Sequence, residues 1–120
     1  SRASAADYPW TAVSFGNNTF VAVASGGRGD RVMTSADGVT WVSRASAADY
    51  PWTAVSFGNN MFVAVASGGR GDRVMTSADG VTWVSRASAA DYPWTAVSFG
   101  NNTFVAVASG GRGDRVMSAQ

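Results

Sequence analysis

The chain contains no cysteine, histidine, leucine, isoleucine, lysine or glutamate. Without cysteine there is neither a disulfide framework nor a thiolate metal site. Without histidine, glutamate or lysine, acid–base or nucleophilic chemistry would depend on aspartate, tyrosine or serine alone. The strong helix formers are reduced to alanine, methionine, arginine and one glutamine, while valine, threonine and aromatic residues, which favour strands, carry the apolar content. The composition predicts an all-β protein that is not an enzyme.

Charge and hydropathy also exclude several kinds of partner. Nine arginines against eight aspartates leave a net charge of +1, so no strong field attracts nucleic acid or an anionic membrane. Apolar runs such as 20–24 are far too short to span a bilayer, and no charged-then-apolar signal peptide opens the sequence. We expect no nucleic-acid partner, no membrane partner, no cofactor and no metal. Nothing in the sequence indicates a cellular location.

A period of 42 residues organises the chain. Residues 1–42 and 43–84 are identical except that Thr19 becomes Met61, and 85–120 repeats the same text up to its last three residues. Repetition this close indicates an engineered sequence or a very recent amplification, because drift changes surface positions first. Periods of about 40 residues are typical of supersecondary units that stack to bury their faces. The three segments are therefore predicted to be three structural repeats, the third truncated.

Each repeat is predicted to hold four strands. In the first copy they cover about 10–15, 19–24, 31–35 and 39–43, separated by an Asn-Asn turn, a Gly-rich loop and an Asp-Gly turn. The second segment is apolar on both faces, which predicts a strand covered above and below. One antiparallel sheet between two like sheets satisfies this pattern. That arrangement is a β-propeller blade, and blades have periods in this range.

The strand count predicts self-association. The repeats provide two full blades and a third that lacks its fourth strand, which makes eleven strands. Three blades cannot close a ring, and the end blades would expose large apolar faces. We therefore expect a homo-oligomer that closes the propeller. A dimer would give six blades and a trimer nine.

The stretch 33–41, M-T-S-A-D-G-V-T-W, returns unchanged at 75–83. Gly38 can take a positive φ, and the Asp37 carboxylate can accept hydrogen bonds from unpaired N–H groups of the turn. The segment S-A-D-G-V-T-W resembles the Asp-box, a hairpin motif of sialidase-type and related β-propellers, and is one residue shorter than the family pattern. The structural residues that the resemblance implies are Ser35, Asp37, Gly38, Thr40, Trp41, Ser77, Asp79, Gly80, Thr82 and Trp83.

The resemblance implies a fold rather than an activity. In the family the motif joins the third and fourth strands of a blade, its Asp caps the turn and its Trp packs between strands. The sialidase active site needs Arg, Glu and Tyr from different blades. Identical blades without glutamate do not supply that set, so the resemblance implies no catalytic residue here.

A second cluster, D-Y-P-W, precedes the first strand of each repeat. In a four-stranded meander it lies at the same end of the blade as the Gly-rich loop. Aromatic rings with Asp and Arg suit carbohydrate binding, because rings stack on sugars while charged groups bond hydroxyls. Alternatively, the rings pack between blades and the proline fixes the entry into the strand. The candidate ligand residues are Asp7, Tyr8, Trp10, Arg28, Asp30, Asp49, Tyr50, Trp52, Arg70, Asp72, Asp91, Tyr92, Trp94, Arg112 and Asp114.

Two functions remain open from the sequence. The leading hypothesis is a symmetric self-assembling scaffold with no specific biochemical activity. The alternative is a lectin-like module, whose identical blades would give avidity for clustered sugars. One further expectation concerns the variable position: because it accepts both Thr19 and Met61, it should face solvent or a roomy edge.

Overall fold

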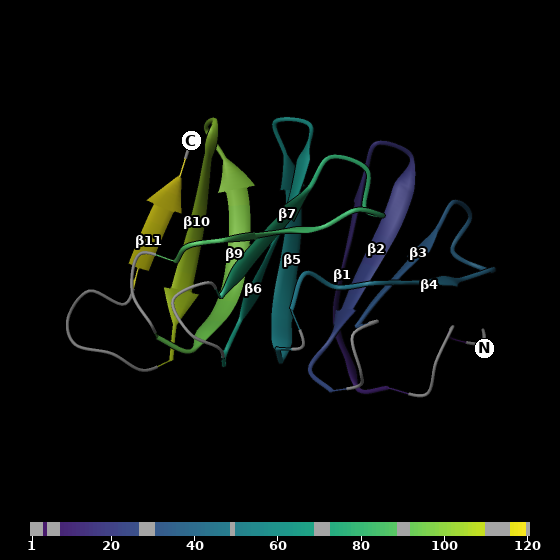
Figure 1. Cartoon of the computed structure of the whole chain (residues 1–120). Helices are drawn as coiled ribbons and strands as arrows, with labels where there is room; N and C mark the ends of the chain where they lie inside the picture. The colour runs from purple at the N-terminus through teal and green to yellow at the C-terminus, as the bar shows by residue number, and fades with distance from the viewer. Residues whose placement is uncertain are drawn as a thin grey trace.

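The computed structural model describes residues 4, 8–26, 31–48, 50–68, 73–88, 92–109 and 116–119. Within them the chain is all-β, with eleven strands and no helix. Figure 1 shows the course of the chain through these strands. The strands are β1 (Trp10–Gly16), β2 (Thr19–Ala24), β3 (Val32–Ser35), β4 (Val42–Arg44), β5 (Trp52–Gly58), β6 (Met61–Ala66), β7 (Val74–Ser77), β8 (Val84–Arg86), β9 (Trp94–Gly100), β10 (Thr103–Ala108) and β11 (Val116–Ala119). The described part of the chain holds no helix long and apolar enough to cross a membrane.

The strands form three antiparallel sheets, which we call blade 1 (β1–β4), blade 2 (β5–β8) and blade 3 (β9–β11). Within each blade the strands follow one another in sequence order, so every sheet is a simple meander. The first strands of successive blades are in contact, β1 with β5 and β5 with β9. The sheets therefore stand face to face in a row, as Figure 1 shows, and the all-β, blade-forming fold is confirmed.

The first hairpin of each blade closes with a two-residue turn. In blade 1 Gly16 pairs with Thr19, and the intervening Asn17 and Asn18 have φ values of 51° and 60°. Two successive left-handed residues match the twist of the flanking strands, and asparagine tolerates that conformation better than most side chains. The corresponding asparagines of the other blades also have positive φ. The turn therefore sets the same register between the first two strands of every blade.

The fourth strand begins later than the sequence predicts. The sequence pattern predicts it over 39–43, but β4 starts at Val42. The N–H groups of Val39 and Thr40 donate to the Asp37 carboxylate, so they are not available to pair with β3. The other predicted strands agree with the structure to within one residue.

The core lies between the blades. Blade 1 contributes Val21, Val23 and Val32 to the first inter-blade core, which blade 2 completes with Trp52, Val55, Phe62, Ala64, Ala66, Met75 and Trp83. The second inter-blade core joins Ala54, Val63, Val65 and Val74 of blade 2 to Trp94, Phe104 and Ala106 of blade 3. Blade 2 is thus covered on both faces, and β6 is buried along all but its first residue. In blade 3, β10 has exposed Val105 and Val107 in alternation with buried residues.

Candidate functional site at the blade faces

Much of the predicted ligand cluster lies outside the described residues. These residues are Asp7, Arg28, Asp30, Asp49, Arg70, Asp72, Asp91, Arg112 and Asp114. The described remainder consists of the three Tyr-Trp pairs. No group of three or more aspartate, glutamate, histidine or cysteine side chains that could hold a metal occurs in the described ranges.

The Tyr-Trp pairs belong largely to the inter-blade cores. The rings of Tyr50 and Trp52 lie 5.9 Å apart, and the Trp52 indole donates to the Ala48 carbonyl at 3.1 Å. Trp52 and Trp94 are fully buried, whereas Trp10 of blade 1 is half-buried. The structure therefore places these two indoles in packing contacts, with no free face on which a sugar could stack.

The D-Y-P-W segment and the Gly-rich loop, which the sequence predicts at the same end of the blade, are joined by backbone hydrogen bonds. The Pro9 carbonyl accepts a hydrogen bond from the Ser25 N–H at 3.1 Å, and Pro51 accepts one from Ser67 at the same distance. The segment that enters the first strand therefore lies against the start of the Gly-rich loop in both complete blades. The Pro9 ring also lies close to Gly26, the residue after Ser25, since a Cβ on Gly26 would lie 3.1 Å from that ring.

The Asp-Gly turns are held by side-chain-to-backbone hydrogen bonds. Asp37 Oδ1 accepts the N–H groups of Val39 and Thr40 at 2.9 and 3.0 Å, and Ser35 Oγ accepts the Gly38 N–H at 2.8 Å. Gly38 has a φ of 80°, a conformation that side chains other than glycine adopt at a cost. The bonds from Thr40 and Val39, together with that from the Ser35 hydroxyl, hold the pKa of Asp37 below its ordinary value.

The equivalent turn of blade 2 also contacts blade 1. A Cβ on Gly80 would lie only 2.8 Å from Val21 Cγ2, so the turn packs directly on blade 1. The Trp83 indole is buried in the first inter-blade core, where its N–H donates to the Gly80 carbonyl at 2.9 Å and its ring lies 6.4 Å from that of Phe62. Its counterpart Trp41 is half-buried. The motif therefore joins neighbouring blades, a role that its sequence alone did not reveal.

A phenylalanine of each following blade lies on a glycine of the preceding one. The Phe57 ring occupies the space where a Cβ on Gly16 would stand, and Phe99 covers Gly58 in the same way. Each glycine ends the first strand of its blade. Only the smallest residue permits this contact, so the strand-ending glycine is part of the inter-blade joint.

A threonine hydrogen bond fastens the same joint. Thr11 Oγ1 donates to the Trp52 carbonyl at 2.8 Å, and Thr53 Oγ1 donates to the Trp94 carbonyl at 2.7 Å. Thr95, at the equivalent position of blade 3, donates at 3.3 Å to a carbonyl of its own sheet. Phenylalanine, glycine and threonine together form a joint that repeats at both internal interfaces.

The two outer faces of the row carry the same groups without their partners. Val13 on blade 1 is 60% exposed, while its copy Val55 is 7% exposed inside the row. Val116 on blade 3 is 59% exposed, while its copy Val74 is 9% exposed. The remaining exposed members of the two faces are Phe15, Val105 and Val107. The outer face of blade 1 and the outer face of blade 3 therefore carry the residues of the two sides of an internal interface, and both faces are open in the described structure.

The comparisons with known proteins find similar structures but no family. No protein-family model matches the chain, and no curated protein matches it. Among solved structures it is similar to the crystal structure of the computationally designed Ika4 protein, with 16% sequence identity and a TM-score of 0.49, over 95% of this chain and 92% of that one. It is also similar to the computationally designed Ika8 protein, with 18% identity and a TM-score of 0.47, over 95% of this chain and 46% of that one. The resemblance to Asp-box propellers stays a prediction.

Proposed function

We propose that this chain is a symmetric self-assembling propeller scaffold of engineered origin, not an enzyme. The observation that carries the proposal is the pair of open faces. Phe15 is 53% exposed on blade 1, and Gly100 on blade 3 would have no atom within 4 Å of an added Cβ. These are the copies of the two residues that meet at each internal joint. A second molecule would bring Phe15 onto Gly100 just as Phe57 lies on Gly16.

The threonine bond supports the same docking geometry. Thr53 reaches across to the Trp94 carbonyl inside the chain. In a head-to-tail pair Thr95 of one molecule would reach the Trp10 carbonyl of the next. Burial of the exposed valines in the same contact supplies the hydrophobic driving force, at roughly 25 cal/mol per Å² of apolar surface. The interface between molecules would therefore use the same contacts that the two internal joints already make.

Head-to-tail contacts between unlike faces generate a closed ring when the rotation between copies allows it. Two copies would make six blades, which is the assembly we favour, and three copies would make nine. The wedge angle between blades decides between them. In either ring every blade would have a neighbour on both faces, so no apolar end would remain exposed.

Light scattering at micromolar concentration tests the proposal. We expect a mass of twice the 12.4 kDa chain, or three times that mass for the nine-blade ring. Gly100→Val should reduce the mass to that of one folded chain, because the new side chain occupies the place of the incoming Phe15 ring while meeting nothing within its own molecule. Val84→Thr, at an exposed position on an internal blade, is the matched control and should leave association unchanged. A stable folded monomer of the unmodified chain would overturn the proposal.

A further inference from the structure

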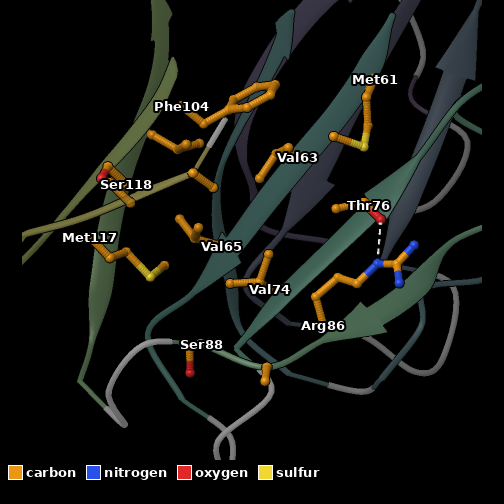
Figure 2. Close-up of a pocket in the computed structure, with 14 residues that line it drawn as sticks. Met61, Val63, Val65, Val74, Thr76, Arg86, Ser88, Phe104, Met117 and Ser118 are labelled. Carbon is orange, nitrogen blue, oxygen red and sulfur yellow. Dashed lines mark hydrogen bonds between the residues drawn. The ribbon is translucent and has the colours of Figure 1, made fainter. Parts of the chain in front are cut away.

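A groove of about 540 Å³ lies between blades 2 and 3. Figure 2 shows Val63, Val65 and Val74 on one side of it and Phe104 and Met117 on the other. At the rim Arg86 Nε donates to Thr76 Oγ1 at 3.0 Å, the dashed line in Figure 2. The groove is apolar and continuous with the second inter-blade core, to which its valines and Phe104 belong.

The variable position lies on this groove. Met61 is half-buried, lines the groove and packs against the second inter-blade core. Its counterparts Thr19 and Thr103 are half-buried as well. The position is therefore half-buried in all three repeats, and its tolerance of either residue stays a prediction.

The corresponding place between blades 1 and 2 is filled from within the chain. Gly80 and Trp83 lie there, on the face that carries Val21 and Val32. With this cover Val21 and Val32 are fully buried, whereas their copies in the groove, Val63 and Val74, retain some exposure. The interface of blades 1 and 2 therefore shows what a filled groove contains: residues 79–84.

The strand next to the groove also has an open edge. In blade 2, β7 pairs with β8 through Thr76 and Val84. In the described part of blade 3, β11 pairs with β10 alone. An open strand edge offers unpaired N–H and C=O groups that an added strand can satisfy, while side-chain pockets select its sequence.

We propose that this groove and the β11 edge bind an extended peptide with the chemistry of 79–86, D-G-V-T-W-V-S-R, supplied in trans. The last three residues of the segment, V-S-R, add to β11 as a fourth antiparallel strand. Their valine lies opposite Ser118, as Val84 lies opposite Thr76. Its Asp-Gly turn packs against Val63, and its indole contacts Phe104 as Trp83 contacts Phe62. The groove is built within one chain, so the proposal does not depend on ring closure.

Calorimetric titration of that eight-residue peptide into the full chain tests the proposal. We expect one peptide bound per chain and slower hydrogen exchange of the amides of Val116–Ala119. The same peptide with alanine in place of tryptophan should bind at least about tenfold more weakly, because the buried indole is its anchor. In the chain, Met117→Asp places a charge in the groove and should abolish binding, while Val39→Asp, on the exposed turn of blade 1, should not affect it.

Fusing the peptide to the chain provides a second test that does not depend on the folding of a groove variant. The peptide sequence is added directly after Gln120, which preserves the 42-residue register. The extended chain should no longer bind free peptide and should protect the β11 amides. An extension with serine in place of tryptophan should still bind it. No heat with about 1 mM peptide, together with unprotected β11 amides in the extended chain, would overturn the proposal.

Discussion

Phe57 and Phe15 occupy the same position in identical repeats, yet their surroundings are opposite. Phe57 lies on Gly16 of the preceding blade, while Phe15 is 53% exposed at the end of the row. The local strand, its register and the neighbouring residues in sequence are the same for both. The difference shows that the adjoining blade decides whether this face of the sheet is covered.

The two tryptophans that follow the Asp-Gly turns also differ in burial, although they occupy the same position in their repeats. Their substitution should give the largest difference in stability. Trp83→Ala should lower the free energy of unfolding by about 3–5 kcal/mol, the usual cost of truncating a buried tryptophan. Trp41→Ala should cost clearly less within one chain, because Trp41 is half-buried and has no preceding blade. Denaturant unfolding of both variants measures the two losses.

Protein concentration sharpens this comparison. In a closed ring Trp41 would pack on blade 3 of the neighbouring molecule, so its variant should lose stability mainly through weaker association. The loss from Trp83→Ala should not change with concentration. Equal, concentration-independent losses in the two variants would contradict the difference between internal and terminal blades.

The threonine bonds give an intermediate effect. Thr53→Val removes a 2.7 Å hydrogen bond between blades and should cost about 0.5–1.5 kcal/mol, the usual net contribution of such a bond. Thr95→Val removes a 3.3 Å bond within one sheet and should change the stability of the single chain less. Thermal unfolding of the two variants side by side measures both. A larger loss from Thr95→Val at low concentration would show that the bond between blades is not the stronger one.

The smallest effect concerns pH. Asp37 and Asp79 have pKa values below the ordinary 3.8, chiefly because the N–H groups of Thr40 and Thr82 donate to them. As pH falls, the unfolded chain takes up protons at these sites first, so their stabilisation is present above pH 3.8 and lost as pH falls through the lower folded pKa. The melting temperature should decline in that acidic range.

The double variant Asp37→Asn with Asp79→Asn isolates this contribution. It should melt at a lower temperature at neutral pH and show a shallower decline on acidification than the unmodified chain. Melting curves collected from neutral to acidic pH make the comparison. Parallel declines in the two proteins would contradict a role for these carboxylates in the pH response.

Several features could be predicted from local sequence because local chemistry decides them. The apolar run of β2 and the Asn-Asn turn specify a strand and a tight hairpin wherever they occur, and all three copies agree. The start of β4 could not be placed correctly by strand propensity. Val39 and Thr40 favour strands, but their N–H groups bond to Asp37 instead of β3.

The sequence by itself determined the repeat, the meander of strands in each blade and the turns, because each depends on residues close together in the chain. Only the tertiary structure decided which copy of a residue is buried, since Val13 and Val55 differ in nothing but the presence of a neighbouring blade. It also decided that Trp83 fills one interface while the equivalent space beside blade 3 forms a groove. Identical residues acquire different roles here because packing between blades depends on position in the row, which the repeated text does not encode.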